Sequence, residues 1–181
     1  LAVFCTVLDG RERPAGEGTG LRRHQNDEHH KAQHKVHEGT GGHHQCPLPY
    51  RRFGQRDAGA LLGRDGIHVL CFSLAAGILS LPAAGAPVQH TAVLIVVGGA
   101  QYRVGSHRQF VRVARHLAAA GHPVLRFDLP GMGDSPGEPL PFEDSAPPIA
   151  ASLDALQQAS GRARAVLWGL CDGASASLLY M

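Results

Sequence analysis

The sequence predicts an α/β fold with a doubly wound, mostly parallel sheet and an N-terminal antiparallel hairpin. Apolar, partly β-branched runs at 91–97 and 165–168 are typical of strands buried on both faces, and 123–127 is expected to be the strand between them in the chain. Helical patterns separate these runs, and glycine-rich turns follow them. Strands that alternate with helices in this way form a parallel sheet with helices packed on it.

The longest apolar run, within 66–88, predicts the hairpin. We expect two strands joined by a tight turn at Ala75-Ala76-Gly77, at an edge of the sheet. The run lies too far from the first residue for a signal peptide. His68 and Pro82 interrupt it near its two ends, so it is a marginal membrane span and we predict none.

Two helices follow from periodicity and end signals. The first is expected to run from a capping Ser106 to Ala120, with Gly121 ending it. Its apolar face carries Phe110, Val113, Ala114 and Leu117. The second is expected from Ala146 or Pro148 to Ala159, closed by Gly161. A turn-rich loop over 128–137 leaves the strand between them.

Residues 1–64 are low in apolar periodicity and rich in Gly, Arg and His, which predicts mostly disorder. The folded domain is therefore expected at 65–181. His30, His34 and His37 would share one helical face and form a weak zinc or nickel site. A solvated polar tract is favoured over that site because nothing supplies a second shell. We predict no metal and no cofactor.

Composition excludes several classes of function. A net charge of +2, from 17 basic and 15 acidic residues in 181, indicates neither a nucleic acid nor a membrane partner. The four cysteines are far apart and form no C-x-x-C pair: Cys5, Cys46, Cys71 and Cys171. This argues against a zinc site or a disulfide scaffold and favours a reducing, cytoplasmic location. The oligomeric state stays open.

The end of the chain carries the most specific motif. The strand at 165–168 is followed by Gly169-Leu-Cys-Asp-Gly173 and a small apolar segment that suits a helix. Strand, G-x-C-x-G and helix form the pattern of a nucleophile elbow, with Cys171 where serine is commoner. The helix dipole would favour a thiolate, and the Asp172 N–H would face a developing oxyanion. The alternative is a buried, inert cysteine chosen for its size.

Three motifs in order connect the sequence with a known family. They are a strand ending in Gly98-Gly99, Asp128-x-x-Gly131-x-Gly133-x-Ser135, and the elbow. This arrangement resembles the α/β-hydrolase superfamily over residues 65–181. More narrowly, the sequence at 96–110, 124–128 and 167–172 resembles that of the exosortase-A-system-associated hydrolases of the first type. These are bacterial proteins encoded beside exopolysaccharide and protein-sorting genes.

The resemblance implies roles for individual residues. Cys171 matches the nucleophile, and the N–H groups of Asp172 and Ala100 match the oxyanion donors. The residues at the mouth of the substrate pocket would be Gly99, Gln101, Tyr102 and Arg103. Arg103 would bind an anionic group or remain a solvated loop charge. Asp128 and Asp134 are expected to order their loop rather than to catalyse.

In this family the catalytic acid and histidine follow the nucleophile in the chain. Only ten residues follow Cys171, and none is histidine. We therefore expect an N-terminal piece of a hydrolase, neither stable nor active alone, with its elbow strand at an exposed edge. The main hypothesis is a cysteine hydrolase or acyl transferase acting on a small ester or thioester. The alternatives are a non-catalytic accessory or binding protein of an exopolysaccharide/exosortase system, and a metal-binding protein built on 24–44.

Overall fold

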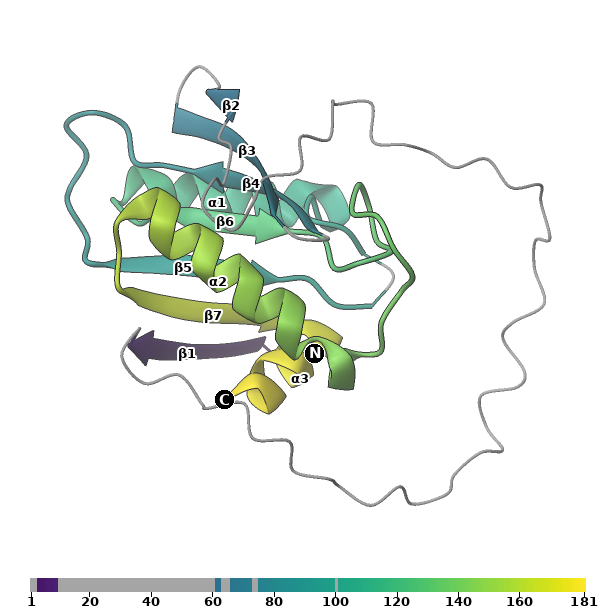
Figure 1. Ribbon diagram of the computed structural model, residues 1–181. Coiled ribbons are helices and arrows are strands. Elements are labelled where there is room, and N and C mark those ends of the chain that lie inside the picture. The colour runs from purple at the N-terminus through teal and green to yellow at the C-terminus, as the bar shows by residue number, and fades with distance from the viewer. Residues whose placement is uncertain (1–2, 10–60, 63–65, 73–74, 100) are drawn as a thin grey trace, which may run out of the picture. The chain divides into compact units, whose positions relative to one another are not determined.

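One mixed β-sheet organises the part of the chain that the computed structural model describes, residues 3–9, 61–62, 66–72, 75–99 and 101–181. These residues belong to one unit of the chain, Leu1–Arg13 with Arg51–Met181. Within it the seven described strands lie in the order β1-β7-β5-β6-β4-β3-β2 (Figure 1). Their bounds are β1 Val3–Asp9, β2 Leu61–Leu62, β3 Ile67–Phe72, β4 Ala75–Ser80, β5 Thr91–Val96, β6 Val124–Phe127 and β7 Arg164–Leu170.

The centre of the sheet is parallel, as predicted. β5 pairs with β6 through Val93 and Val124, and with β7 through Val93 and Val166. Its side chains alternate between two apolar cores, since Val93 and Ile95 enter one and Leu94 and Val96 the other. A strand buried on both faces is expected to be apolar throughout, which explains why this segment was recognisable in the sequence.

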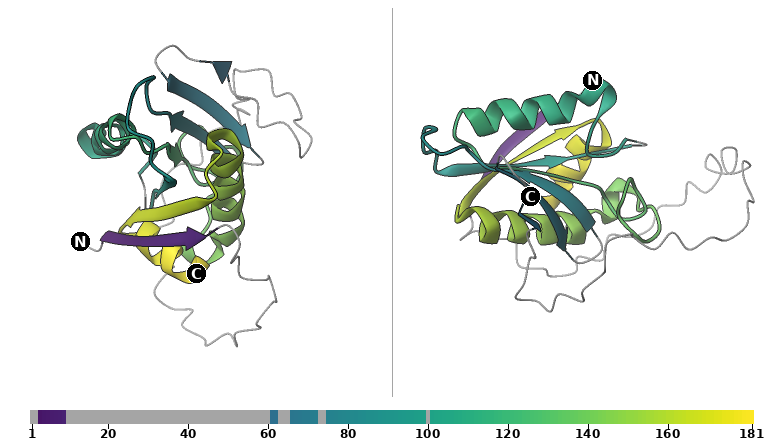
Figure 2. Two further views of the ribbon diagram at one scale, coloured as in Figure 1. Left: turned by 90° about the vertical axis from the view of Figure 1, so that its left-hand side faces the viewer. Right: turned by 90° about the horizontal axis from the view of Figure 1, so that it is seen from above.

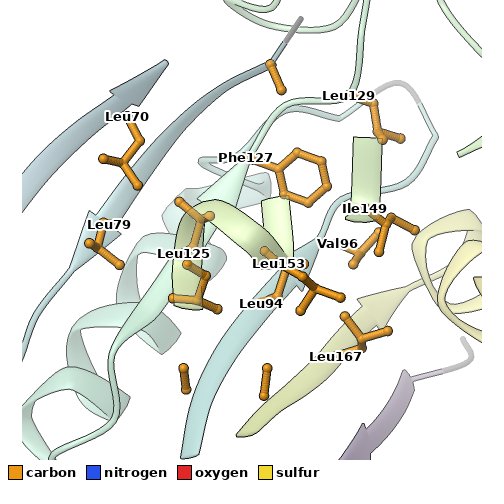
Figure 3. Packing of buried hydrophobic residues seen from close by; sticks show 14 of the residues in the cluster. Leu70, Leu79, Leu94, Val96, Leu125, Phe127, Leu129, Ile149, Leu153 and Leu167 are labelled. Carbon is orange, nitrogen blue, oxygen red and sulfur yellow. The ribbon is translucent and has the colours of Figure 1, made fainter. Parts of the chain in front are cut away.

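Helices cover both faces of the sheet (Figure 2). α1 (Gln109–Ala119) packs Phe110 and Ala114 onto one face, and α2 (Ala146–Ser160) packs Ile149, Leu153 and Leu156 onto the other. The α2 side contains the larger core, which joins side chains of β3, β4, β5, β6 and β7 (Figure 3). α3 (Asp172–Tyr180) follows β7 directly. A short 3₁₀ helix, η3 (Phe142–Asp144), precedes α2.

The predicted hairpin is confirmed, but its turn was placed wrongly. β3 and β4 pair antiparallel from Ile67–Ser80 to Phe72–Ala75, so Ala75, Ala76 and Gly77 lie within β4. Gly77 is opposite Phe127 of β6, and a Cβ added to it would lie 2.9 Å from Leu125 Cδ1. The glycine thus permits a close strand contact rather than a turn. β2 pairs on the outer side of β3, beyond the hairpin.

The expectation that the elbow strand forms a sheet edge is wrong. β1 runs antiparallel to β7 over its whole length, from Val3–Leu170 to Asp9–Arg164. The β-branched and aromatic run of Val3–Asp9 suits a strand, although it lies in the segment expected to be mostly disordered. The ladder groups of β7 therefore have partners on both sides, in β5 and in β1. The histidine-rich stretch at 24–44 lies outside the described residues.

The helix ends agree with the sequence except at one cap. Ser106 does not cap α1: it begins a 3₁₀ turn, η2 (Ser106–Arg108), and Arg108 occupies the cap position at φ 60°. The Ser106 hydroxyl contacts His107 Nδ1 instead, at 2.9 Å. Gly121 ends α1 and Gly161 ends α2 at positive φ, as predicted. No helix among the described residues has the length and apolarity needed to cross a membrane.

Candidate functional site: a cysteine elbow

Cys171 occupies the sharp bend between β7 and α3. β7 ends at Leu170, α3 begins at Asp172, and Cys171 between them has φ 56° and ψ −126°. This region of backbone space is nearly restricted to glycine, and a side chain there costs about 1–3 kcal/mol. The residue is exposed. The strand, bend and helix predicted for 165–180 are therefore present, with the sulfur at the bend.

Three glycines allow this bend to form. A Cβ on Gly169 would lie 2.3 Å from the carbonyl oxygen of Gly173, and one on Gly173 would lie 2.3 Å from that of Val96. Glycine at 169 and 173 is part of the predicted G-x-C-x-G pattern, and these collisions explain why it is needed there. Gly98 has an equal role that the sequence did not reveal, because its Cβ would lie 2.0 Å from the Gly173 nitrogen. β5, β7 and α3 can meet only without these side chains.

The first turn of α3 presents backbone donors beside the sulfur. The Cys171 carbonyl accepts hydrogen bonds from the N–H groups of Ala174 (2.9 Å) and Ser175 (3.3 Å), which fixes the start of the helix. Asp172 and Gly173 are the first two residues of α3, so their own N–H groups have no partner within the helix. The geometry is suited to an oxyanion at this end, where the helix dipole is positive.

A carboxylate lies next to the sulfur, a feature that the sequence analysis missed. The Asp172 Oδ1 atom is 3.7 Å from Cys171 Sγ, within the range of an S–H···O hydrogen bond. Asp172 Oδ2 faces the β5 side, where a Cβ on Gly99 would lie 3.6 Å away. Asp172 thus contributes a negative charge to the site in addition to its N–H.

The segment after β5 carries the remaining predicted site residues. Ala100, the expected second oxyanion donor, lies outside the described residues. Gly99, Gln101 and Tyr102 are exposed, and Gly99 has φ 65°. Their role in substrate binding stays a prediction.

Arg103 is held by two carboxylates. Its guanidinium donates from Nη1 to Asp128 and from Nη2 to Asp134, and its backbone N–H donates to Asp128 Oδ1 at 2.6 Å. Burial lowers the pKa of Arg103, but its bonds to Asp134 and Asp128 outweigh this and raise it. A guanidinium engaged in this way is poorly placed to bind an anionic substrate, which argues against one of the roles expected for it.

Asp128 and Asp134 order the loop after β6, as expected. The Asp134 N–H donates to Asp128 Oδ2 at 3.1 Å, and the Ser135 hydroxyl donates to the Asp128 carbonyl at 2.7 Å. Asp128 is fully buried, so the N–H of Asp134 and the donors of Arg103 replace the water that its carboxylate would otherwise bind.

The comparison with known families decides the classification. Residues 91–181 match the family described as the alpha/beta hydrolase fold. The chain belongs to the α/β-hydrolase fold family. The matched region begins at β5 and includes the Arg103 segment, the Asp128 loop and the elbow. No curated protein matches the chain.

A crystal structure from Agrobacterium vitis S4, of a protein that carries a provisional hydrolase name, is similar to this α/β-hydrolase chain. The identity is 19% and the TM-score 0.40, over 56% of this chain and 36% of that one. The chain therefore spans about a third of the length of that protein.

Arg126 of β6 is a second arginine that the sequence analysis overlooked in this α/β-hydrolase domain. It is 6% exposed, and its Nη1 donates to the Arg103 carbonyl at 2.8 Å. Burial, followed by the positive charges of Arg103 and Arg115, lowers the pKa of Arg126 to about 10. A buried arginine within an otherwise apolar strand is unusual, and here its contact ties β6 to the segment after β5.

Proposed function

We propose that the protein is a hydrolase or acyl transferase that uses Cys171 as its nucleophile on a small ester or thioester. The observation that carries the proposal is the exposed Cys171 at φ 56° and ψ −126°, between a buried strand and a helix. Such a strained backbone persists only where the surroundings enforce it, and it is typical of catalytic residues. Membership of the α/β-hydrolase fold family supports the same reaction class.

The proposed chemistry is acylation of the sulfur. Cys171 Sγ attacks the carbonyl carbon, an S–C bond forms, and the carbonyl electron pair moves onto the oxygen. The Asp172 N–H, with a second N–H from the segment after Gly99, stabilises this oxyanion. Collapse of the intermediate expels the alcohol or thiol, and the proton of the Cys171 thiol passes to the leaving group or to solvent. Water or another acceptor then takes the acyl group.

In this family an acid and a histidine act with the nucleophile as its general-base system. General-base help is commonly worth about 10²–10⁴-fold in rate. Acylation by an activated ester depends least on such help because its leaving group needs no proton. This half-reaction is therefore the step that tests Cys171 itself most directly.

We further propose that the chain is related to the exosortase-A-system-associated hydrolases. This proposal is supported by the amino-acid sequence at 96–110, 124–128 and 167–172, which resembles that of those hydrolases. The carboxylate of Asp172, 3.7 Å from the sulfur, favours a second candidate function. A carboxylate in contact with the sulfur takes up space that a substrate carbonyl would need, as expected for a non-catalytic accessory or binding protein of the same fold.

The test is to incubate the chain with p-nitrophenyl acetate and to locate the acetyl group by peptide mass spectrometry. We expect release of p-nitrophenolate in proportion to protein, with the acetyl group on Cys171. Cys171→Ala should abolish this burst, whereas Cys71→Ala, which removes a half-buried cysteine of β3, should retain it. Acetylation spread evenly over the cysteines, or none at Cys171, would support the accessory role instead.

A further inference from the structure

Asp172 brings a carboxylate into direct contact with the proposed nucleophile. Its Oδ1 atom lies 3.7 Å from Cys171 Sγ, and its Oδ2 atom would lie 3.6 Å from a Cβ on Gly99. Asp172 is half-buried in the first turn of α3, whereas Cys171 beside it is exposed. A molecule that reaches the sulfur therefore also approaches this negative charge.

The carboxylate of Asp172 has no positive partner in the part of the chain that the structure describes. No basic side chain there contacts it, and its contact is with the sulfur of Cys171. Asp128 and Asp134, in contrast, share the guanidinium of Arg103. A half-buried charge without a counter-ion is unfavourable, and a cation that binds beside it relieves this cost.

Two arginines of the domain are not available as that cation. The guanidinium of Arg103 is committed to Asp128 and Asp134. Arg126 is 6% exposed and donates to the Arg103 carbonyl at 2.8 Å. Neither can bind Asp172 or an anionic group of a substrate without giving up these contacts. The charge that a ligand meets beside the sulfur is thus the negative one of Asp172.

We propose that Asp172 determines which charge the substrate carries: its carboxylate binds a cationic group of the acyl part, such as an ammonium a few bonds from the scissile carbonyl, and disfavours anionic acyl groups. This inference rests on the proposed function and narrows its substrate class. Attack by the sulfur places a negative charge on the carbonyl oxygen. A cationic substrate neutralises Asp172 before this oxyanion forms, whereas an anionic substrate adds a further negative charge.

The first experiment measures the charge preference at the sulfur without acyl chemistry. Two methanethiosulfonates, the cationic trimethylammonioethyl and the anionic sulfonatoethyl reagent, each form a mixed disulfide with the thiol and release methanesulfinate. The rate constants at Cys171 are measured by peptide mass spectrometry. Their ratio, cationic over anionic, is divided by the same ratio for N-acetylcysteinamide, so the intrinsic reactivity of the sulfur cancels.

The variants separate charge from size. Asp172→Asn removes the charge at nearly constant size, and Asp172→Glu keeps the charge. Asp154→Asn is the matched control, because it removes one negative charge from α2. Trp168 fluorescence reports whether each variant is folded.

We expect a normalised ratio of about ten for the wild type, because reagent charges of opposite sign about 6 Å from a carboxylate differ by about that factor even at the dielectric constant of water. Asp172→Glu and Asp154→Asn should keep this preference, and salt should weaken it. Asp172→Asn should bring the ratio close to one. A ratio near one in the wild type, or an equal ratio in the wild type and Asp172→Asn, overturns the proposal.

The second experiment applies the same comparison to acylation. The p-nitrophenyl esters of 4-trimethylammoniobutyrate and of adipate, the second with its other carboxyl free, carry opposite charges on the acyl part. We expect the cationic ester to acylate Cys171 at least about tenfold faster than the anionic one, and Asp172→Asn to lose this difference. Equal rates in the wild type overturn the substrate class. If the thiosulfonates show the preference but no ester acylates Cys171, the proposed function itself fails.

Discussion

Gly173→Ala tests whether the elbow depends on contact between α3 and β5. Gly173 is a helical residue without positive φ, so helix propensity alone predicts that alanine stabilises the fold by about 1 kcal/mol. The contacts predict the opposite sign. The added Cβ would lie 2.3 Å from the carbonyl oxygen of Val96, the last residue of β5, and 3.1 Å from the nitrogen of Gly98, just after that strand. Both are backbone atoms.

The magnitude follows from the displacement that is needed. Ordinary contact begins at 3.4 Å, so α3 and β5 must separate by roughly 1 Å to accept the methyl group. Overpacking of this kind costs about 1–3 kcal/mol, and more where only backbone can move. We expect a loss of about 3 kcal/mol in the free energy of unfolding. The separation should also shift the N–H groups of α3 away from the sulfur.

The assay is urea unfolding followed by the fluorescence of Trp168, the only tryptophan of the chain. Trp168 lies on β7 and packs edge-on against Phe110, with ring centroids 5.7 Å apart, so its signal reports the site of the change. The control is Gly161→Ala, where φ is 67° and nothing lies within 4 Å. It should cost only about 1–2 kcal/mol of left-handed strain. If Gly173→Ala equals or exceeds the wild type in stability, the close packing is refuted.

Three further predictions concern single side chains. Cys171→Gly should raise the free energy of unfolding by about 1 kcal/mol, because relief of about 1–3 kcal/mol of backbone strain exceeds the entropic cost of glycine. Cys171→Ser keeps the strain and should change the free energy of unfolding little. Urea unfolding in which Cys171→Ser is more stable than Cys171→Gly would contradict the strain at this position. Ser135→Ala should cost about 1–3 kcal/mol in the same assay, because the half-buried Ala76 N–H and the buried Asp128 carbonyl lose a partner, and the exposed Ser106→Ala is its control. Asp172→Asn should speed alkylation of Cys171, since it removes a negative charge 3.7 Å from the sulfur; a slower reaction would mean that the carboxylate assists the thiol.

The sequence predicted the elements that have a strong local signal. β5 and β7 were recognisable from apolar runs typical of strands buried on both faces, and β6 as the next strand, between two helical patterns. Gly121 and Gly161 marked helix ends. The elbow was predicted from the G-x-C-x-G pattern, whose glycines at 169 and 173 avoid collisions with neighbouring backbone. The structure confirms this geometry, whereas the chemical role of Cys171 stays a proposal.

The errors arose where a residue type has two uses. Gly77 suggested a turn, but it serves a close contact between β4 and β6. Ser106 suggested a helix cap, yet η2 intervenes and Arg108 takes that position. β1 was missed because a short run near an end of the chain has no local feature that names its partner.

The ion pairs of Arg103 could not be predicted from the sequence for a related reason. Asp128 and Asp134 were expected to order their own loop, but their contact with Arg103 joins two segments that only the sheet brings together. Arg126 was similarly hidden, because a charged residue within a strand gives no indication of the carbonyl that it meets. Local patterns reveal elements, whereas such long-range polar contacts require the assembled fold.

The most direct test of Cys171 as a nucleophile compares two rate constants for its alkylation by iodoacetamide. One is measured in the folded chain and the other in the chain unfolded by urea. Cys71, half-buried on β3, is the internal reference in both states. We predict that Cys171 reacts faster folded than unfolded, because the bend exposes the sulfur at the positive end of α3, while Cys71 reacts more slowly folded. A Cys171 that reacts more slowly in the folded chain would contradict its assignment as an activated nucleophile.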